Sequence, residues 1–115
     1  MAARPITLQD LRNIDLIPQA VIGKPVSFFE HALGLHFIDD FDDLDYYRGA
    51  AMRLDDKLPF ALMHHRGDPP DTTTLYLPRE LRDVEEISRA IRAILDEMKI
   101  PPDSIRWQRS DDPAL

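Results

Sequence analysis

The stretch that decides the fold is YYRGAAMRLDDKLPFALMHHRGDPPDTTTLYL, residues 46–77. It predicts three successive strands, Tyr46–Leu54, Pro59–His65 and Thr72–Leu77, separated by polar and proline-containing connections. The middle strand carries four apolar residues in a row at positions 60–63, which is typical of a strand covered on both faces. We therefore expect this middle strand to lie in the interior of the sheet.

The residues before this stretch predict a strand, a helix and a second short strand. Apolar residues over positions 14–22 predict a strand that Pro18 interrupts or ends, because proline in a strand favours an edge or a bulge. The segment Pro25–Gly34 predicts a helix, since proline suits a first helical turn and glycine a C-terminal stop. A short strand is expected over residues 35–38. Thr7 can begin one helical turn in an otherwise loosely organised N-terminal segment.

A long amphipathic helix and a final strand complete the chain. Asp83 and Glu86 form a capping box, apolar residues recur every three or four positions as far as Met98, and two prolines follow at 101–102. Ile105–Arg109 predicts a last strand. The resulting order, βαβββ followed by a shortened βαβ, indicates an α+β protein with two helices packed on a mostly antiparallel sheet.

Length and composition favour one domain spanning residues 1–115, and 43% hydrophobic residues can fill one core. The formal net charge of −7 argues against binding nucleic acid, which requires a concentrated basic surface. No apolar run is long enough to span a bilayer, and we expect no membrane association. The chain has no cysteine, which excludes disulfides and thiolate metal sites and suits a cytoplasmic location.

The most unusual composition lies just before the decisive stretch. Five aspartates occupy seven positions there: Asp39, Asp40, Asp42, Asp43 and Asp45. We interpret the run as a loop that is either simply solvated or a patch that binds a basic protein partner. Calcium binding is a weaker alternative, because the run lacks the glycine and the distal glutamate of a helix-loop-helix calcium loop.

The histidines are the other candidate chemistry. His64 and His65 are neighbours on a predicted strand, so their side chains point to opposite faces and cannot hold one ion together. They are nevertheless the best metal candidates that the chain offers. The sequence contains no metal motif, nucleophile elbow, phosphate-binding glycine loop or dinucleotide fingerprint. We therefore expect no cofactor and no catalytic residues.

One stretch resembles a known family. Residues 28–37, FFEHALGLHF, resemble the helix-to-strand corner of the glyoxalase/bleomycin-resistance/dioxygenase group, the vicinal oxygen chelate fold. The resemblance implies a βαβββ unit used twice, with metal ligands from the first strand of each unit and from the last. The first strands expected here, over residues 14–22 and 72–77, contain no histidine. A metal site of this kind would therefore be degenerate and would lie near His64 or His65.

Three functions follow as hypotheses. The first is a small, acidic, non-enzymatic protein-binding module of the inhibitor or immunity type, which binds a basic protein through the aspartate run. The second is a small-molecule binder or metal enzyme with a degenerate site, as the family resemblance implies. The third is a homodimer formed through an exposed sheet edge, at Thr72–Leu77 or Ile105–Arg109.

Overall fold

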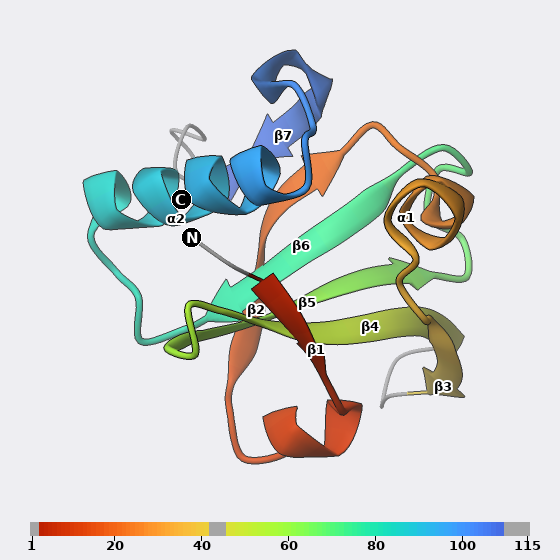
Figure 1. The fold of residues 1–115 in the computed structure, drawn as a ribbon, viewed down its shortest axis with the longest axis horizontal. Coiled ribbons are helices and arrows are strands. Elements are labelled where there is room, and N and C mark those ends of the chain that lie inside the picture. The colour runs from red at the N-terminus through yellow and green to blue at the C-terminus, as the bar shows by residue number, and fades with distance from the viewer. Residues whose placement is uncertain (1–2, 42–45, 110–115) are drawn as a thin grey trace.

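The computed structural model describes residues 3–41 and 46–109 as a seven-stranded sheet with two α-helices packed on it (Figure 1). Every strand pairing in the sheet is antiparallel, which confirms the α+β class. The strands are β1 (Ala3–Ile6), β2 (Leu16–Ile22), β3 (Ile38–Phe41), β4 (Tyr46–Leu54), β5 (Leu58–His65), β6 (Thr73–Pro78) and β7 (Ile105–Gln108). The helices are α1 (Val26–Leu33) and α2 (Val84–Glu97), and two short 3-10 turns are η1 (Leu8–Leu11) and η2 (Pro102–Ser104).

The strands follow the order β1-β4-β5-β6-β2-β7, and β3 also pairs with β4. β5 therefore lies in the interior, as its apolar run predicts. β6 lies between β5 and β2, so the expectation that Thr72–Leu77 offers an edge is wrong. At the far end, β3 and β1 share one edge of β4, with β3 facing residues 46–49 and β1 facing residues 51–54.

Each helix begins and ends where the local sequence favours it. The Asp83 side chain accepts a hydrogen bond from the Glu85 backbone N–H at 3.0 Å, which satisfies one free donor at the start of α2. α1 follows Pro25 and ends at Gly34, which has a φ of 68°. Glycine adopts this left-handed conformation without steric cost. Neither helix of the described chain is long and apolar enough to cross a membrane.

The two faces of the sheet differ in how they are covered (Figure 1). α1 and α2 pack on one face and bury the large core, which includes Phe29, Phe60 and Ile91. On the other face, η1 covers a smaller cluster built around Leu11 and Ala61. Burial of apolar area at about 25 cal/mol per Å² makes the helix-covered face the main source of stability.

Two local predictions are wrong. Residues 3–6 form the edge strand β1, which pairs with β4 from Ala3–Leu54 to Ile6–Ala51 and is joined to the β4–β5 turn by an Arg4–Asp56 ion pair. The short strand expected over 35–38 instead covers Ile38–Phe41, so Asp39 and Asp40 lie on a strand and not in a loop. Pairing with β4 decides both cases, because strand formation depends on the partner more than on local propensity.

Candidate binding groove at the end of the sheet

A groove of about 350 Å³ lies at the end of the sheet where β3, β4 and β5 meet. We call it the β3–β4 groove. It is lined by charged, aromatic and imidazole side chains: Asp39, Asp40, Tyr46, Tyr47, Arg48, His64 and Arg66. The structure thus brings two of the predicted acidic residues together with one of the predicted histidines.

Arg48 organises the charges of the groove. Its Nε lies 3.1 Å from Asp39 Oδ1, and its Nη2 lies 3.2 Å from Glu30 Oε2 on α1. Asp39 and Arg48 face each other directly across the β3–β4 pair. Arg48 therefore offsets part of the acidic charge, and Asp40 is left as the carboxylate of β3 that forms no ion pair with any described residue.

Apolar side chains gather at the same edge. Ile38, Phe41 and Tyr46 are 45%, 69% and 60% exposed, and among the described residues the remaining large exposed apolar side chain is that of Val84 on α2. The rings of Phe41 and Tyr46 lie edge-to-face with centroids 5.8 Å apart. The Arg66 guanidinium lies 5.3 Å from the centre of the Tyr46 ring, a cation–π arrangement.

The outer edge of β3 is unpaired within residues 3–41 and 46–109, because β3 pairs there with β4 alone. All four of its residues are exposed. An exposed strand edge presents backbone N–H and C=O groups to a further strand. This end of the sheet therefore combines the groove with a strand edge that is unpaired among the described residues, the exposed rings of Phe41 and Tyr46, and the Asp40 carboxylate.

His64 has a defined tautomer at the groove wall. Its Nδ1 lies 2.8 Å from the backbone carbonyl oxygen of Thr72. A carbonyl oxygen only accepts, so Nδ1 must carry the hydrogen and donate, and in the neutral ring Nε2 carries the lone pair. His64 can thus accept a hydrogen bond or ligate a metal only through Nε2.

His65 lies on the opposite face of the sheet, as strand alternation predicts. Its ring centroid is 5.3 Å from that of Tyr47 and 6.3 Å from that of Tyr76. The two histidines therefore do not share one site. Across the part of the chain that the structure describes, no three His, Cys, Asp or Glu side chains come together in a way that could hold a metal ion.

Gly49 positions the aromatic side of the groove. A Cβ at this position would lie 2.8 Å from the Tyr47 ring, closer than real Cβ contacts allow. The missing side chain lets the Tyr47 ring lie over the strand backbone and reach His65. A glycine inside a strand often marks such a close approach, and this was a signal in the sequence for the position of Tyr47.

Sequence reasoning found some of these residues and missed others. Asp39, Asp40 and His64 line the groove, whereas Asp42, Asp43 and Asp45 lie outside the described residues. Arg48 and Arg66 were missed, because no local pattern indicates that a strand arginine and a turn arginine converge on the aspartates. Arg48 lies inside the predicted strand Tyr46–Leu54 and Arg66 directly follows the predicted strand Pro59–His65, and neither position carries a signal specific to a site.

Compared with known proteins, the chain matches no family model, no curated protein and no solved structure.

Proposed function

We propose that the protein is a non-enzymatic binding module that captures a basic protein partner through β3 and the β3–β4 groove, in the manner of an inhibitor or immunity protein. The observation that carries the proposal is the clustering of Ile38, Phe41 and Tyr46, all more than 40% exposed, beside the carboxylates of β3. Exposed aromatic anchors with a polar rim are typical of protein interfaces.

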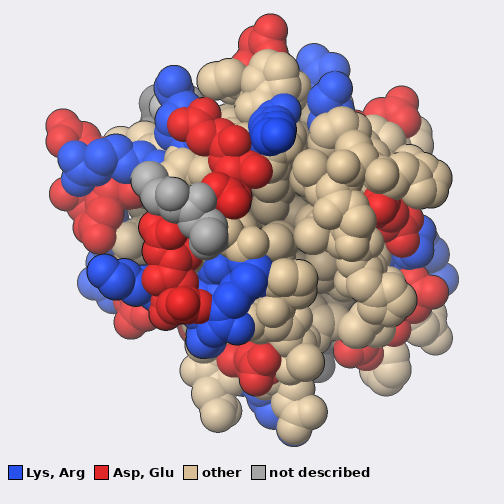
Figure 2. Space-filling model, viewed as in Figure 1, with Lys and Arg blue, Asp and Glu red and all other residues tan. Residues whose placement is uncertain are grey.

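The outer edge of β3, which pairs with no further strand of the described chain, favours β3 over the α2 surface as the docking site. Figure 2 shows positive and negative side chains intermixed over α2, whereas the surface over α1 is largely uncharged. Intermixed charges give a basic partner little net attraction. The β3–β4 groove is mixed in charge as well, with Arg48 and Arg66 beside Asp39 and Asp40. The preference for β3 therefore rests on its outer edge, where backbone hydrogen bonds and side-chain contacts would act together.

The proposal is tested by photocrosslinking from β3 in an extract of the native host. A benzophenone analogue of phenylalanine at position 41 reports partners of the edge, and the same analogue at the exposed position 84 on α2 is the matched control. We expect a basic protein to be crosslinked from position 41 alone, and the yield to fall in Asp39→Asn/Asp40→Asn and at high salt. Identical products from both positions would contradict the proposal.

Small-molecule binding is the second candidate function, and we propose it for the sheet face that carries η1. It is supported by a groove of about 850 Å³ between η1 and the sheet, with Leu8, Ile14 and Met63 among the apolar lining residues and Tyr47 and Tyr76 beside them. Apolar concave sites with a few polar groups are the usual form of a ligand site. This proposal corresponds to the function that resemblance to the vicinal oxygen chelate group implies.

Native mass spectrometry of the protein purified gently from its own host tests the second candidate. We expect a small-molecule adduct on the wild-type chain that is lost in Met63→Trp, because the larger ring fills the groove. Far-UV circular dichroism checks that the variant stays folded. A mass without adduct, or an adduct that persists in the folded variant, would remove the η1 groove from consideration.

A further inference from the structure

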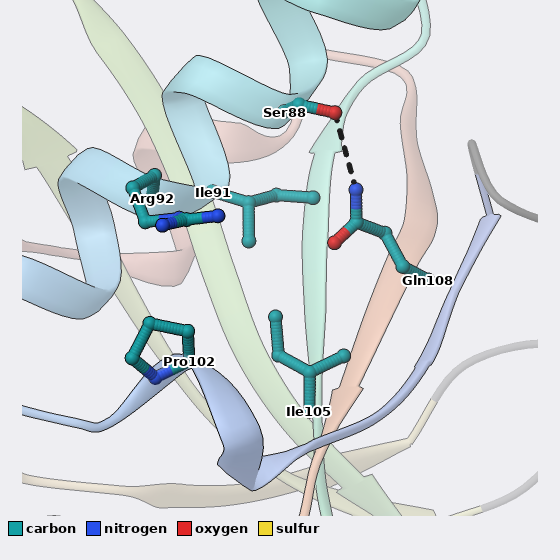
Figure 3. A pocket seen from close by; sticks show the side chains of 6 residues that line it. All are labelled: Ser88, Ile91, Arg92, Pro102, Ile105 and Gln108. Carbon is teal, nitrogen blue, oxygen red and sulfur yellow. Dashed lines mark hydrogen bonds between the residues drawn. The ribbon is translucent and has the colours of Figure 1, made fainter.

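A third concave site, which we call the α2–β7 cleft, lies at the opposite edge of the sheet from β3, between α2 and the η2–β7 segment (Figure 3). Its volume is about 370 Å³. The lining residues come from both elements and are Ser88, Ile91, Arg92, Pro102, Ile105 and Gln108. A cleft of this size is at the lower end of the range for small-molecule sites.

The base of the cleft is apolar. Ile91 is 1% exposed and belongs to the main core, and Ile105 packs against that core from β7. Pro102 of η2 forms a further apolar wall (Figure 3). A short branched aliphatic group placed here would be removed from water against Pro102 and Ile105, which favours binding.

Polar groups surround this apolar floor of the cleft. The Gln108 side-chain N–H donates to Ser88 Oγ at 3.2 Å, so β7 is tied to α2 across the cleft. Because the Ser88 oxygen accepts this bond, its own O–H remains able to donate to a ligand. Figure 3 shows the Arg92 guanidinium extending beside Ile91, on the side away from Gln108.

Arg92 is available to a ligand. It forms no ion pair with any described residue, although Asp96 lies one helical turn further along α2. Ser88 and Arg92 are four positions apart, so their side chains lie on the same side of the helix. A guanidinium next to a buried isoleucine favours a planar anion, because arginine and a carboxylate can form two parallel hydrogen bonds.

We propose that this cleft binds a small carboxylic acid with a branched aliphatic chain. The carboxylate pairs with Arg92, and the aliphatic chain packs on Pro102 and Ile105 above the buried Ile91. The site shares no residue with the β3–β4 groove, so this inference is independent of the proposed protein-binding function.

The test is an NMR titration of the ¹⁵N-labelled full chain with 4-methylpentanoate, with neutral 4-methylpentanamide as the comparison ligand. We expect saturable shifts at the amides of Ile91, Ile105 and Gln108 with the acid, and affinity for the amide weaker by roughly 10-fold or more. Absence of saturable shifts at millimolar acid, or equal binding of the amide, would overturn the proposal.

A matched pair of variants identifies the cation. Arg92→Gln should weaken binding of 4-methylpentanoate by roughly 10- to 100-fold, the usual effect of losing a charge-assisted hydrogen bond. Arg89→Gln removes the same charge from α2 at a position outside the cleft and should leave the affinity within about twofold, since exposed charges are screened. Equal losses in both variants would show a general charge effect and would refute the site.

Discussion

Arg48 Nε lies 3.1 Å from Asp39 Oδ1 across paired strands, and the same side chain reaches Glu30 on α1 at 3.2 Å. One arginine therefore connects β3, β4 and α1 at the edge proposed to bind a partner. All three side chains are at least partly exposed, so the ion pairs contribute little to stability. Their main effect is on the charge that the edge presents.

Arg48→Gln should therefore change the affinity for a partner while leaving the stability of the protein almost unchanged. We expect the free energy of unfolding to fall by less than about 1 kcal/mol, because the ion pairs are solvent-screened. The affinity for a basic partner should rise, since Asp39 is no longer neutralised. Urea denaturation and a binding titration measure the two quantities. Weaker partner binding would show that Arg48 itself contacts the partner.

Gly49→Ala should destabilise the protein by about 1–3 kcal/mol, because the added methyl group would lie 2.8 Å from the Tyr47 ring. The ring must move, which also breaks its packing on His65. In a protein that already carries Tyr47→Ala, Gly49→Ala should destabilise less, because the ring it would contact is gone. The losses of stability from the two single substitutions should therefore not add. Thermal unfolding of the two single variants and the double variant measures this coupling. If the stability losses of the two single variants sum to that of the double variant, position 49 does not lie against the Tyr47 ring.

Gln19→Met should stabilise the protein by about 1 kcal/mol. Gln19 is 2% exposed at the irregular part of β2, and its Oε1 has no hydrogen-bond partner among the residues that the structure describes. A buried polar atom without a partner costs roughly 1–3 kcal/mol, and methionine fills a similar volume without that cost.

Thr73→Val is the matched control for this position. Thr73 is equally buried, but its hydroxyl donates to the Lys24 carbonyl oxygen at 2.8 Å. This variant should lose stability, because the carbonyl is left without its donor. Chemical denaturation of both variants gives the comparison. Destabilisation by Gln19→Met would indicate that the amide is satisfied in solution.

Asp10 should make the stability of η1 depend on pH. The backbone N–H of Thr7 donates to the Asp10 carboxylate at 3.0 Å. This bond, followed by a hydrogen bond from the Thr7 side chain, lowers the pKa of Asp10. A lowered pKa in the folded state stabilises the protein above the unfolded pKa, and this contribution is lost as pH falls through the folded pKa.

The measurement is the free energy of unfolding of the wild type and of Asp10→Asn at a series of pH values below about 5. The wild type should lose more stability on acidification than the variant, which has no carboxyl group to protonate at this position. Parallel curves for the two proteins would show that the hydrogen bonds between Thr7 and Asp10 at the start of η1 do not form in solution.

Local patterns were sufficient for most of the fold. The alternation and apolar run within residues 46–77 predicted β4, β5 and β6 to within one residue at each end. The spacing of apolar residues and the Asp83 cap predicted α2, because helix hydrogen bonds and caps are made within the segment itself. Pro18 correctly marked the irregular pairing of β2.

Long-range pairing decided what those patterns could not. β1 is a strand only because it lies against residues 51–54, and the acidic Ile38–Phe41 is a strand only because it lies against residues 46–49. The groove follows from the same pairing, which brings Asp39 opposite Arg48 and places His64 on the next strand. Helices form from contacts close in sequence, whereas strands and sites require partners from elsewhere in the chain, so the edge, the groove and the α2–β7 cleft depend on tertiary structure.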